Sequence, residues 1–266
     1  MIYLKTEEEI ELIRQSSILV SNTIAEIASM IRPGINGLAL DKRAEEFIKD
    51  HHGVPAFKGL HGFPASLCIS KNEEVVHGIP NEKAFKEGDV ISIDCGVLQN
   101  DFYGDSAYTF ALRPVAEDIV QLLRVTLESL NLGVLQARIG NRLGDISYAI
   151  EEHTEGKHHY GVVRELVGHG IGMQLHEPPE VPNYGKRGKG MVLKEGLVIA
   201  IEPMINLGTR KVKQLKDGWT MVTLDKKISA HFEHTVAVRR ENGECLSDHS
   251  SIEKSVKNNL ELTKIA

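Results

Sequence analysis

The sequence predicts an α+β domain built from two related halves around antiparallel strands. Three observations support this prediction. Helical periodicity and strand-like runs follow each other twice along the 266 residues. A polar break inside the stretch 88–110 predicts a β-hairpin. Residues 87–94, EGDVISID, return 108 residues later as EGLVIAIE at 195–202, which indicates an internal repeat.

The first half begins with two predicted helices. Thr6 and Glu9 fit a capping box, and isoleucines then recur at roughly helical spacing until Pro33 ends the helix. A second amphipathic helix is expected over residues 38–52, and two short strands follow it. These elements lead directly into the hairpin.

The hairpin carries the first chemical signal. An apolar strand ends at Asp94, and the run after the polar break contains Asp105. A two-residue loop centred between Gln99 and Asn100 is expected to place the two aspartates directly opposite each other. Their Cβ atoms would then lie about 5 Å apart, an arrangement that destabilises like charges. Either one carboxyl has a raised pKa or a cation lies between them.

The second half repeats the order of the first. A strand-like stretch at 162–172 precedes the repeated strand, which ends at Glu202, and a last strand over 228–238 carries Glu233. Its two helices are expected over 117–136 and 144–158. No Pro/Ser-rich linker separates the halves, so we expect one catalytic domain over 1–266. Its site is expected where the two halves meet, which we call the seam. Its parts are halves of about 1–112 and 113–240 and a C-terminal tail, 241–266.

Four carboxylates in otherwise apolar strands indicate a metal site. They are Asp94, Asp105, Glu202 and Glu233. One such acid is usually exposed or at a sheet edge, but a repeat that places four makes this explanation weak. The strands contain no Lys or Arg, and buried acids rarely occur without partners or metal. Four carboxylates and an imidazole can hold two divalent ions.

Three histidines are candidates for this site. Glycines flank His169 and leave its imidazole free to bind a metal, although a hydrogen-bonded core histidine is equally compatible with this motif. His176 follows seven residues later, too far for a pair of metal ligands on one helix. It is better interpreted as a hydrogen-bond donor, either to a metal ligand or to the substrate. His77 lies in a His-Gly-Ile echo of His169 and has the same status.

Composition excludes several classes of protein. Hydrophobic residues are 41% and charged residues 26%, as in ordinary globular proteins, and the net charge of −6 gives no sign of nucleic-acid recognition. Three scattered cysteines form neither a disulfide framework nor a zinc site. No signal peptide or membrane span is evident, so the cytoplasm is expected. The chain has no Gly-x-Ser-x-Gly, Walker or His-Glu-x-x-His motif.

Three stretches resemble the type I methionine aminopeptidases: HGIGMQLHEPPEVPNYG, EGLVIAIEPM and the last strand with Glu233. The resemblance runs from the first helix to about Arg239. It implies the pita-bread fold of creatinase, prolidase and aminopeptidase P, with two pseudo-symmetric halves around a curved antiparallel sheet. It also implies removal of the initiator methionine from nascent proteins when the second residue is small. The chain is most similar to the short bacterial form, because it lacks the type II insertion and the N-terminal zinc-binding extension.

The resemblance also assigns roles to residues. It implies two divalent ions (Co, Mn, Fe or Zn) held by Asp94, Asp105, His169, Glu202 and Glu233. A hydroxide bridging the ions would attack the first peptide carbonyl, with Glu202 as the proton shuttle and His176 beside the oxyanion. His77 and His176 would contact the substrate. A monovalent cation, Na or K, is implied near Asn72, Glu74 and Ser229.

The implied pocket for the methionine side chain departs from the family pattern. Its walls would be Leu60, Phe63, Cys68, Leu175 and Trp219. Leu60 and Leu175 stand where relatives have aromatic residues, so we expect a wider pocket that prefers Met but accepts Leu or norleucine better. The expected partners are N-termini of nascent polypeptides, with the ribosome as one place of action, and a monomer is expected. The alternatives are an X-Pro aminopeptidase or prolidase-like enzyme and a non-catalytic pita-bread module that binds peptides.

Overall fold

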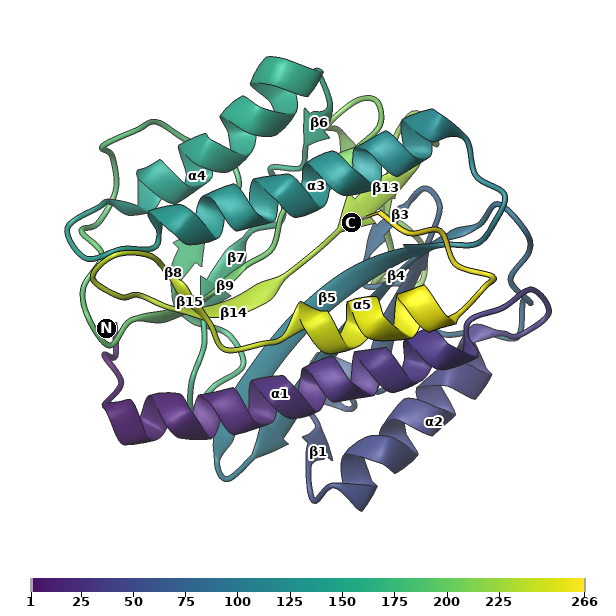
Figure 1. Cartoon of the computed structure of the whole chain (residues 1–266), viewed down its shortest axis with the longest axis horizontal. Coiled ribbons are helices and arrows are strands. Elements are labelled where there is room, and N and C mark those ends of the chain that lie inside the picture. The colour runs from purple at the N-terminus through teal and green to yellow at the C-terminus, as the bar shows by residue number, and fades with distance from the viewer. Residues whose placement is uncertain (1, 266) are drawn as a thin grey trace.

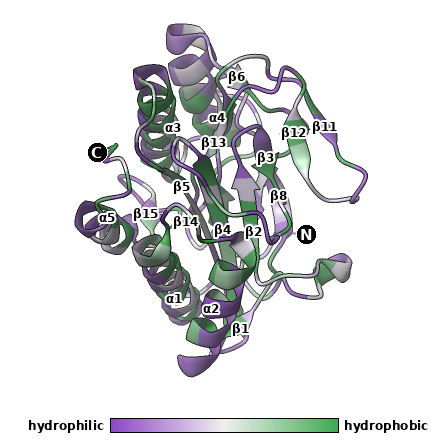
Figure 2. Ribbon diagram, turned by 90° about the vertical axis from the view of Figure 1, so that its right-hand side faces the viewer, coloured by the Kyte–Doolittle hydropathy of each residue, from purple (hydrophilic) through white to green (hydrophobic). Residues whose placement is uncertain are grey.

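The computed structural model describes residues 2–265. Its helices gather on one side of the strands, as Figure 2 shows, while β11 and β12 extend on the other side. The α-helices are α1 (Glu7–Met30), α2 (Gly37–Asp50), α3 (Glu117–Gln136), α4 (Leu143–Glu151) and α5 (His249–Asn258). Among the described residues, no helix combines the length and apolar character that a membrane span requires.

The first helices begin where the sequence predicts. The amide of Glu9 donates to Thr6 Oγ1 at 3.3 Å and the amide of Thr6 donates to Glu9 Oε2 at 2.8 Å, which confirms the capping box. The isoleucine face of α1 is buried, and the helix ends three residues before Pro33. Asn36 caps α2 through its side-chain oxygen, which accepts a hydrogen bond from the amide of Ala39.

The strands form short antiparallel sheets. Those of the first half are β1 (Val54–Pro55), β2 (Leu67–Lys71), β3 (Glu74–Val76), β4 (Val90–Gln99) and β5 (Phe102–Ala111). Those of the second half are β6 (Gly161–Val162), β7 (Gly168–Gly170), β8 (Glu177–Val181), β9 (Val198–Ile201), β10 (Met204–Asn206), β11 (Val212–Gln214), β12 (Met221–Thr223), β13 (Ser229–His231), β14 (His234–Ala237) and β15 (Glu244–Cys245). Leu60–Gly62 is a short 3-10 turn.

The two repeated strands have matching surroundings. β4 lies between β2 and β5, and β9 lies between β7 and β14, with antiparallel pairing in every case. In each half, therefore, the repeated strand lies between strands that precede it and a strand that follows it in the chain, with β1 as an additional preceding partner of β4. Figure 1 shows α1 and α2 beside the first half and α3 and α4 beside the second. We propose on this basis that the domain has the expected halves, about 1–112 and 113–240, and the tail 241–266.

The register of the hairpin differs from the prediction. The loop consists of Asn100 and Asp101, both with left-handed φ values (52° and 64°), as a tight hairpin turn requires. This loop lies one residue later than expected, so Asp94 faces Ala107 and Asp105 faces Gly96. The two aspartates are diagonal neighbours on the same face of the hairpin and not a directly opposed pair.

Two further predictions need correction. The helix predicted over 144–158 is α-helical only to Glu151, and Glu152–Lys157 forms a π-helical turn. The last strand, predicted as continuous over 228–238, divides into β13 and β14 because their partners differ. β13 pairs with β10 and β14 pairs with β9, so the chain shifts between sheets at residues 232 and 233. Glu233 lies in this break.

Candidate metal centre

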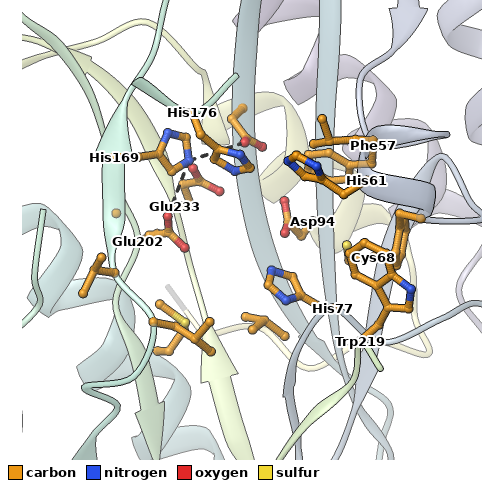
Figure 3. Close-up of a pocket in the computed structure, with 18 of the residues that line it drawn as sticks. Phe57, His61, Cys68, His77, Asp94, His169, His176, Glu202, Trp219 and Glu233 are labelled. Atoms are coloured by element: carbon orange, nitrogen blue, oxygen red, sulfur yellow. Dashed lines mark ion pairs between the residues drawn. The ribbon is translucent and has the colours of Figure 1, made fainter. Parts of the chain in front are cut away.

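One cavity of about 440 Å³ lies between the two halves. All five residues predicted as metal ligands line it: Asp94, Asp105, His169, Glu202 and Glu233. Figure 3 shows Glu202, Glu233 and His169 on one side of this space and Asp94 across from them. The sequence repeat therefore predicts which acids meet, although Asp94 and Glu233 lie 139 residues apart in the chain.

Hydroxyl groups hold the two halves together directly behind these acids. Thr235 Oγ1 donates to the carbonyl oxygen of Asp105 at 2.8 Å, and Ser106 Oγ donates to the carbonyl oxygen of Glu233 at 2.7 Å. The amide of Glu233 donates to the carbonyl oxygen of Ala107 at 3.0 Å. The backbone on which both acidic side chains stand is thus fixed from the opposite half.

The geometry around His169 suits a metal ligand. Its Nδ1 is 2.9 Å from the carbonyl oxygen of Gly170, which can only accept, so the proton lies on Nδ1 and Nε2 keeps its lone pair. That Nε2 is 3.6 Å from Glu202 Oε1 and 3.9 Å from Asp105 Oδ2. One ligand atom from each of Asp105, His169 and Glu233 lies within 4.8 Å of the others.

The electrostatics of the acids call for a cation. Among residues 2–265, no Lys or Arg makes an ion pair with them, and Asp94 Oδ1, Asp105 Oδ1 and Glu233 Oε1 are buried without a hydrogen-bond partner. Burial raises the pKa of Asp94 to about 7 and that of Glu202 to about 8. Burial, then the nearby carboxylates, also raises the pKa of Asp105 and Glu233. Buried oxygens of this kind fit a divalent cation, which stabilises the charged carboxylates.

Two further histidines face the cavity. The rings of His169 and His176 are edge to face with centroids 4.5 Å apart. His77 reaches the cavity from the chain segment after β3. Burial, with help from His231 and His176, lowers the pKa of His77 to about 4, and burial also lowers the pKa of His176. Both rings are therefore neutral near pH 7 and available as hydrogen-bonding groups.

An apolar pocket adjoins the acids. Leu60, Phe63, Cys68 and Trp219 line it as predicted, and the rings of Phe63 and Trp219 are edge to face at 5.1 Å. Leu175 does not line the cavity. It is buried in the same apolar cluster behind the wall, because the chain bends before β8 and turns the side chain of Leu175 into the core while His176 faces the cavity.

Comparison with known proteins defines the family. The sequence profile of metallopeptidase family M24 matches residues 11–240. The chain belongs to this family. It is 49% identical to the methionine aminopeptidase of Clostridium perfringens over 93% of this chain and 99% of that protein. The methionine aminopeptidase of Rickettsia prowazekii has a structure with a TM-score of 0.91 and 39% identity, covering 93% of this chain and 100% of that one.

The M24 assignment confirms the predicted pita-bread fold and the resemblance to methionine aminopeptidases. The prolidase of Pyrococcus furiosus shares the fold at a lower TM-score, 0.72, and 25% identity. This chain covers only 65% of that prolidase. As a member of M24, the chain binds divalent metal.

Several residues beside the acids or at the cavity were not predicted from the sequence. His231 Nε2 lies 3.5 Å from Glu202 Oε2, and the spacing of two residues from Glu233 could have indicated a common face. Phe57 and His61 line the cavity from the Gly/Pro/aromatic loop. The ring of Phe57 forms part of the apolar wall. It adds an aromatic residue to a wall that was expected to have fewer of them than in relatives.

Asn72, Glu74 and Ser229, the residues expected near a monovalent cation, make hydrogen bonds within the protein. The amide of Ser229 donates to the carbonyl oxygen of Asn72 at 2.9 Å, so these two segments touch. Glu74 Oε2 accepts a hydrogen bond from the amide of Lys71 at 2.8 Å. The Asn72 side chain bridges Asp89 and the amide of Val90. These contacts bring the three residues into one region.

Proposed function

We propose that the chain is a metal-dependent aminopeptidase that removes the N-terminal methionine from polypeptides with a small second residue. One observation carries this proposal: the four acids and His169 converge on a cavity that continues into an apolar pocket. A charged end of this kind suits a peptide carbonyl and a free amine, and the apolar end suits a methionine side chain.

In this proposal, Asp94, Asp105, His169, Glu202 and Glu233 hold two divalent ions. Co, Mn, Fe and Zn all suit this donor set, because it combines carboxylate oxygens with one imidazole. Divalent ions bound there acidify a water molecule and polarise a peptide carbonyl. Asn72, Glu74 and Ser229 are the proposed site of a monovalent cation, Na or K.

The remaining steps use groups of the chain. Glu202, a carboxylate that lines the cavity directly after β9, is proposed to take a proton from water and deliver it to the leaving amine. His176 donates a hydrogen bond to the oxyanion that develops at the first carbonyl. His77, across the cavity, contacts the substrate near its free amine. Hydrogen-bonding of that amine restricts cleavage to N-termini.

The apolar pocket sets the preference for the first residue. Phe63 and Trp219 offer ring edges to a thioether sulfur, at about 0.3–1.5 kcal/mol per contact. Leu60 is smaller than an aromatic residue, whereas Phe57 adds a ring to the wall. We propose that Met is preferred, and that Leu and norleucine are cleaved better than by enzymes whose pocket is lined by more aromatic residues.

The proposed substrates are N-termini of nascent polypeptides, in the cytoplasm and at the ribosome, and the chain is proposed to act as a monomer. The β11–β12 hairpin supports ribosome contact. It places Trp219 at the cavity and exposes six basic side chains around it, which suits a phosphate-rich surface. They are Arg210, Lys211, Lys213, Lys216, Lys226 and Lys227.

A peptide panel tests the proposal. Enzyme stripped of metal and enzyme reconstituted with Co²⁺ or Mn²⁺ are compared on Met-Ala-Ser and Ala-Pro-Ala. We expect only reconstituted enzyme to act, and to release Met from Met-Ala-Ser. Asp105→Asn is the matched inactive control, because it keeps the shape of the side chain. Faster cleavage of Ala-Pro-Ala would support the prolidase-like alternative, and binding without cleavage would support a peptide-binding module.

A further inference from the structure

The C-terminal segment of this chain contacts the proposed metal centre from behind. The family match ends at residue 240, and similar structures that are covered completely still leave 7% of this chain uncovered. This segment contains α5. Figure 1 shows α5, in yellow, lying along α1, in purple, at the opposite end of the sequence.

Specific contacts anchor α5. Ile252 and Val256 are buried, and the amide of Asp248 donates to Ser21 Oγ of α1 at 2.8 Å. Beyond the helix, Asn259 Nδ2 donates to two carbonyl oxygens at the end of α1, each at 2.8 Å. The helix is therefore fixed to α1 at both ends, and these contacts hold its first residue in place.

That first residue, His249, reaches the seam between the halves. Its Nε2 is 3.1 Å from the carbonyl oxygen of Glu233 and 3.2 Å from Ser106 Oγ. Its ring lies against the His234 ring with centroids 3.7 Å apart, and its edge-to-face contact with Tyr108 is at 5.2 Å. Aromatic rings thus hold the imidazole in one orientation.

The hydrogen-bond pattern defines the proton on this ring. A carbonyl oxygen can only accept, so Nε2 carries the hydrogen and donates it to Glu233. Ser106 uses its own hydroxyl hydrogen on the same carbonyl and presents an acceptor to His249. Within residues 2–265, Nδ1 of His249 has no hydrogen-bond partner, as expected for a neutral ring with its one proton on Nε2.

We propose that His249 is a positioning residue for the metal centre. It holds the backbone carbonyl of Glu233 and the hydroxyl of Ser106, the residue after Asp105. Two acids from opposite halves therefore share one support, and a shift of either backbone would change the spacing of their carboxylates. This inference rests on the proposed metal centre. It adds that the C-terminal helix, outside the matched family region, tunes metal affinity.

The test measures metal affinity and not only activity. Calorimetric titration of metal-stripped protein with Mn²⁺ gives Kd for the unmodified chain and four variants. His249→Phe keeps an aromatic ring and removes the donor. His249→Gln restores a donor close to the position of Nε2. Ile252→Ala is the matched control, because it removes buried apolar contact from the same helix without touching the seam.

The expected results separate positioning from general destabilisation. We expect His249→Phe to raise Kd about tenfold, within the range for lost partners around metal ligands. His249→Gln should recover most of this loss, and Ile252→Ala should lower Tm while leaving Kd within twofold. Ser106→Ala, a small change that removes the hydroxyl, should also raise Kd and serves if His249→Phe does not fold.

Three results would overturn the inference. The first is an unchanged Kd in both His249→Phe and Ser106→Ala. The second is a Kd for Ile252→Ala as high as that of His249→Phe, which would show that loss of packing explains the effect. The third is an unmodified chain that binds no Mn²⁺ under any condition, a result that would reject the proposed metal centre itself.

Discussion

Replacement of Lys5 by Met tests how the segment before α1 supports the segment that carries His176. Lys5 Nζ lies 2.6 Å from Glu177 Oε2, and the two side chains are only 1% and 11% exposed. Glu177 follows His176 in the chain, and its other oxygen accepts a hydrogen bond from the amide of Gln174 at 3.1 Å. The ion pair therefore ties the segment before α1 to the loop that carries His176.

The size of the effect follows from burial. Removal of one partner of a buried ion pair costs about 3–5 kcal/mol, because the other charge stays desolvated. Glu177 is slightly exposed and keeps its contact with Gln174, so we expect the lower end, about 3 kcal/mol. At roughly 2–4 °C per kcal/mol for a chain of this size, Lys5→Met should lower Tm by about 6–12 °C.

Urea unfolding of matched variants measures this effect. Lys49→Met is the control, because Lys49 pairs with Glu45 at the same distance, 2.6 Å, but is 60% exposed. We expect it to cost less than about 1 kcal/mol. Lys5→Met combined with Glu177→Gln should recover part of the loss, since no unpaired charge remains. Equal effects of Lys5→Met and Lys49→Met would refute the argument from burial.

Three further predictions concern the cavity. His176→Ala should keep metal but reduce kcat about 100-fold through loss of an oxyanion donor, as metal analysis and steady-state kinetics on one sample will show. His77→Gln should make the free energy of unfolding of the metal-free protein less dependent on pH between pH 6.5 and 4, and urea unfolding measures this. Tripeptides led by Met, Leu and norleucine should give a higher Leu-to-Met ratio of kcat/KM than an enzyme with aromatic residues at the positions of Leu60 and Leu175.

The direction of the pH effect follows from proton binding. Burial lowers the pKa of His77 to about 4, so between pH 6.5 and 4 the unfolded chain binds a proton at this residue and the folded chain does not. The stability contribution is therefore complete above pH 6.5 and is lost as the pH falls toward 4. Its size is at most about 3 kcal/mol. Parallel pH curves for the two proteins would contradict this reasoning.

Other outcomes would contradict the remaining two predictions. A lower metal stoichiometry in His176→Ala would make His176 a metal ligand and its assigned role wrong. A Leu-to-Met ratio of kcat/KM no higher than that of the enzyme with aromatic residues would show that Phe57 fills the space in the pocket wall. This is the simplest alternative, because Phe57 lines the cavity. A preference for Ala-Pro N-termini over Met would reject the proposed substrate.

Local rules predicted much of the fold. The capping box at Thr6, the helix 117–136 and the existence of the hairpin are confirmed, because each depends on neighbouring residues or on simple periodicity. The hairpin register was wrong by one loop position, since it depends on which residues adopt left-handed φ values. Asn100 and Asp101 both do, and no hydrophobic pattern on the two strands distinguishes that loop from its neighbour.

The site was predictable where the repeat marks it and not elsewhere. Asp94 and Glu202 occupy matching positions of the repeat, so their common location follows from the pseudo-symmetry, although β4 continues beyond Asp94 to Gln99 and β9 ends at Ile201. His249 and Leu175 could not be placed in this way. His249 reaches the seam only because α5 docks on α1, and the direction of Leu175 depends on the local path of the chain before β8. Both are consequences of tertiary packing, which a single sequence does not encode in any local pattern.

The contacts at the seam hold the acids of this site close together. Four buried carboxylates oppose folding through desolvation, so the chain needs other contacts to hold them close together. Ser106, Thr109 and Thr235 provide these contacts, since each donates a hydroxyl hydrogen across the seam to a backbone carbonyl. A divalent metal that binds these carboxylates in the folded chain stabilises the folded state by mass action, by about 2.7 kcal/mol when its concentration is 100 times Kd.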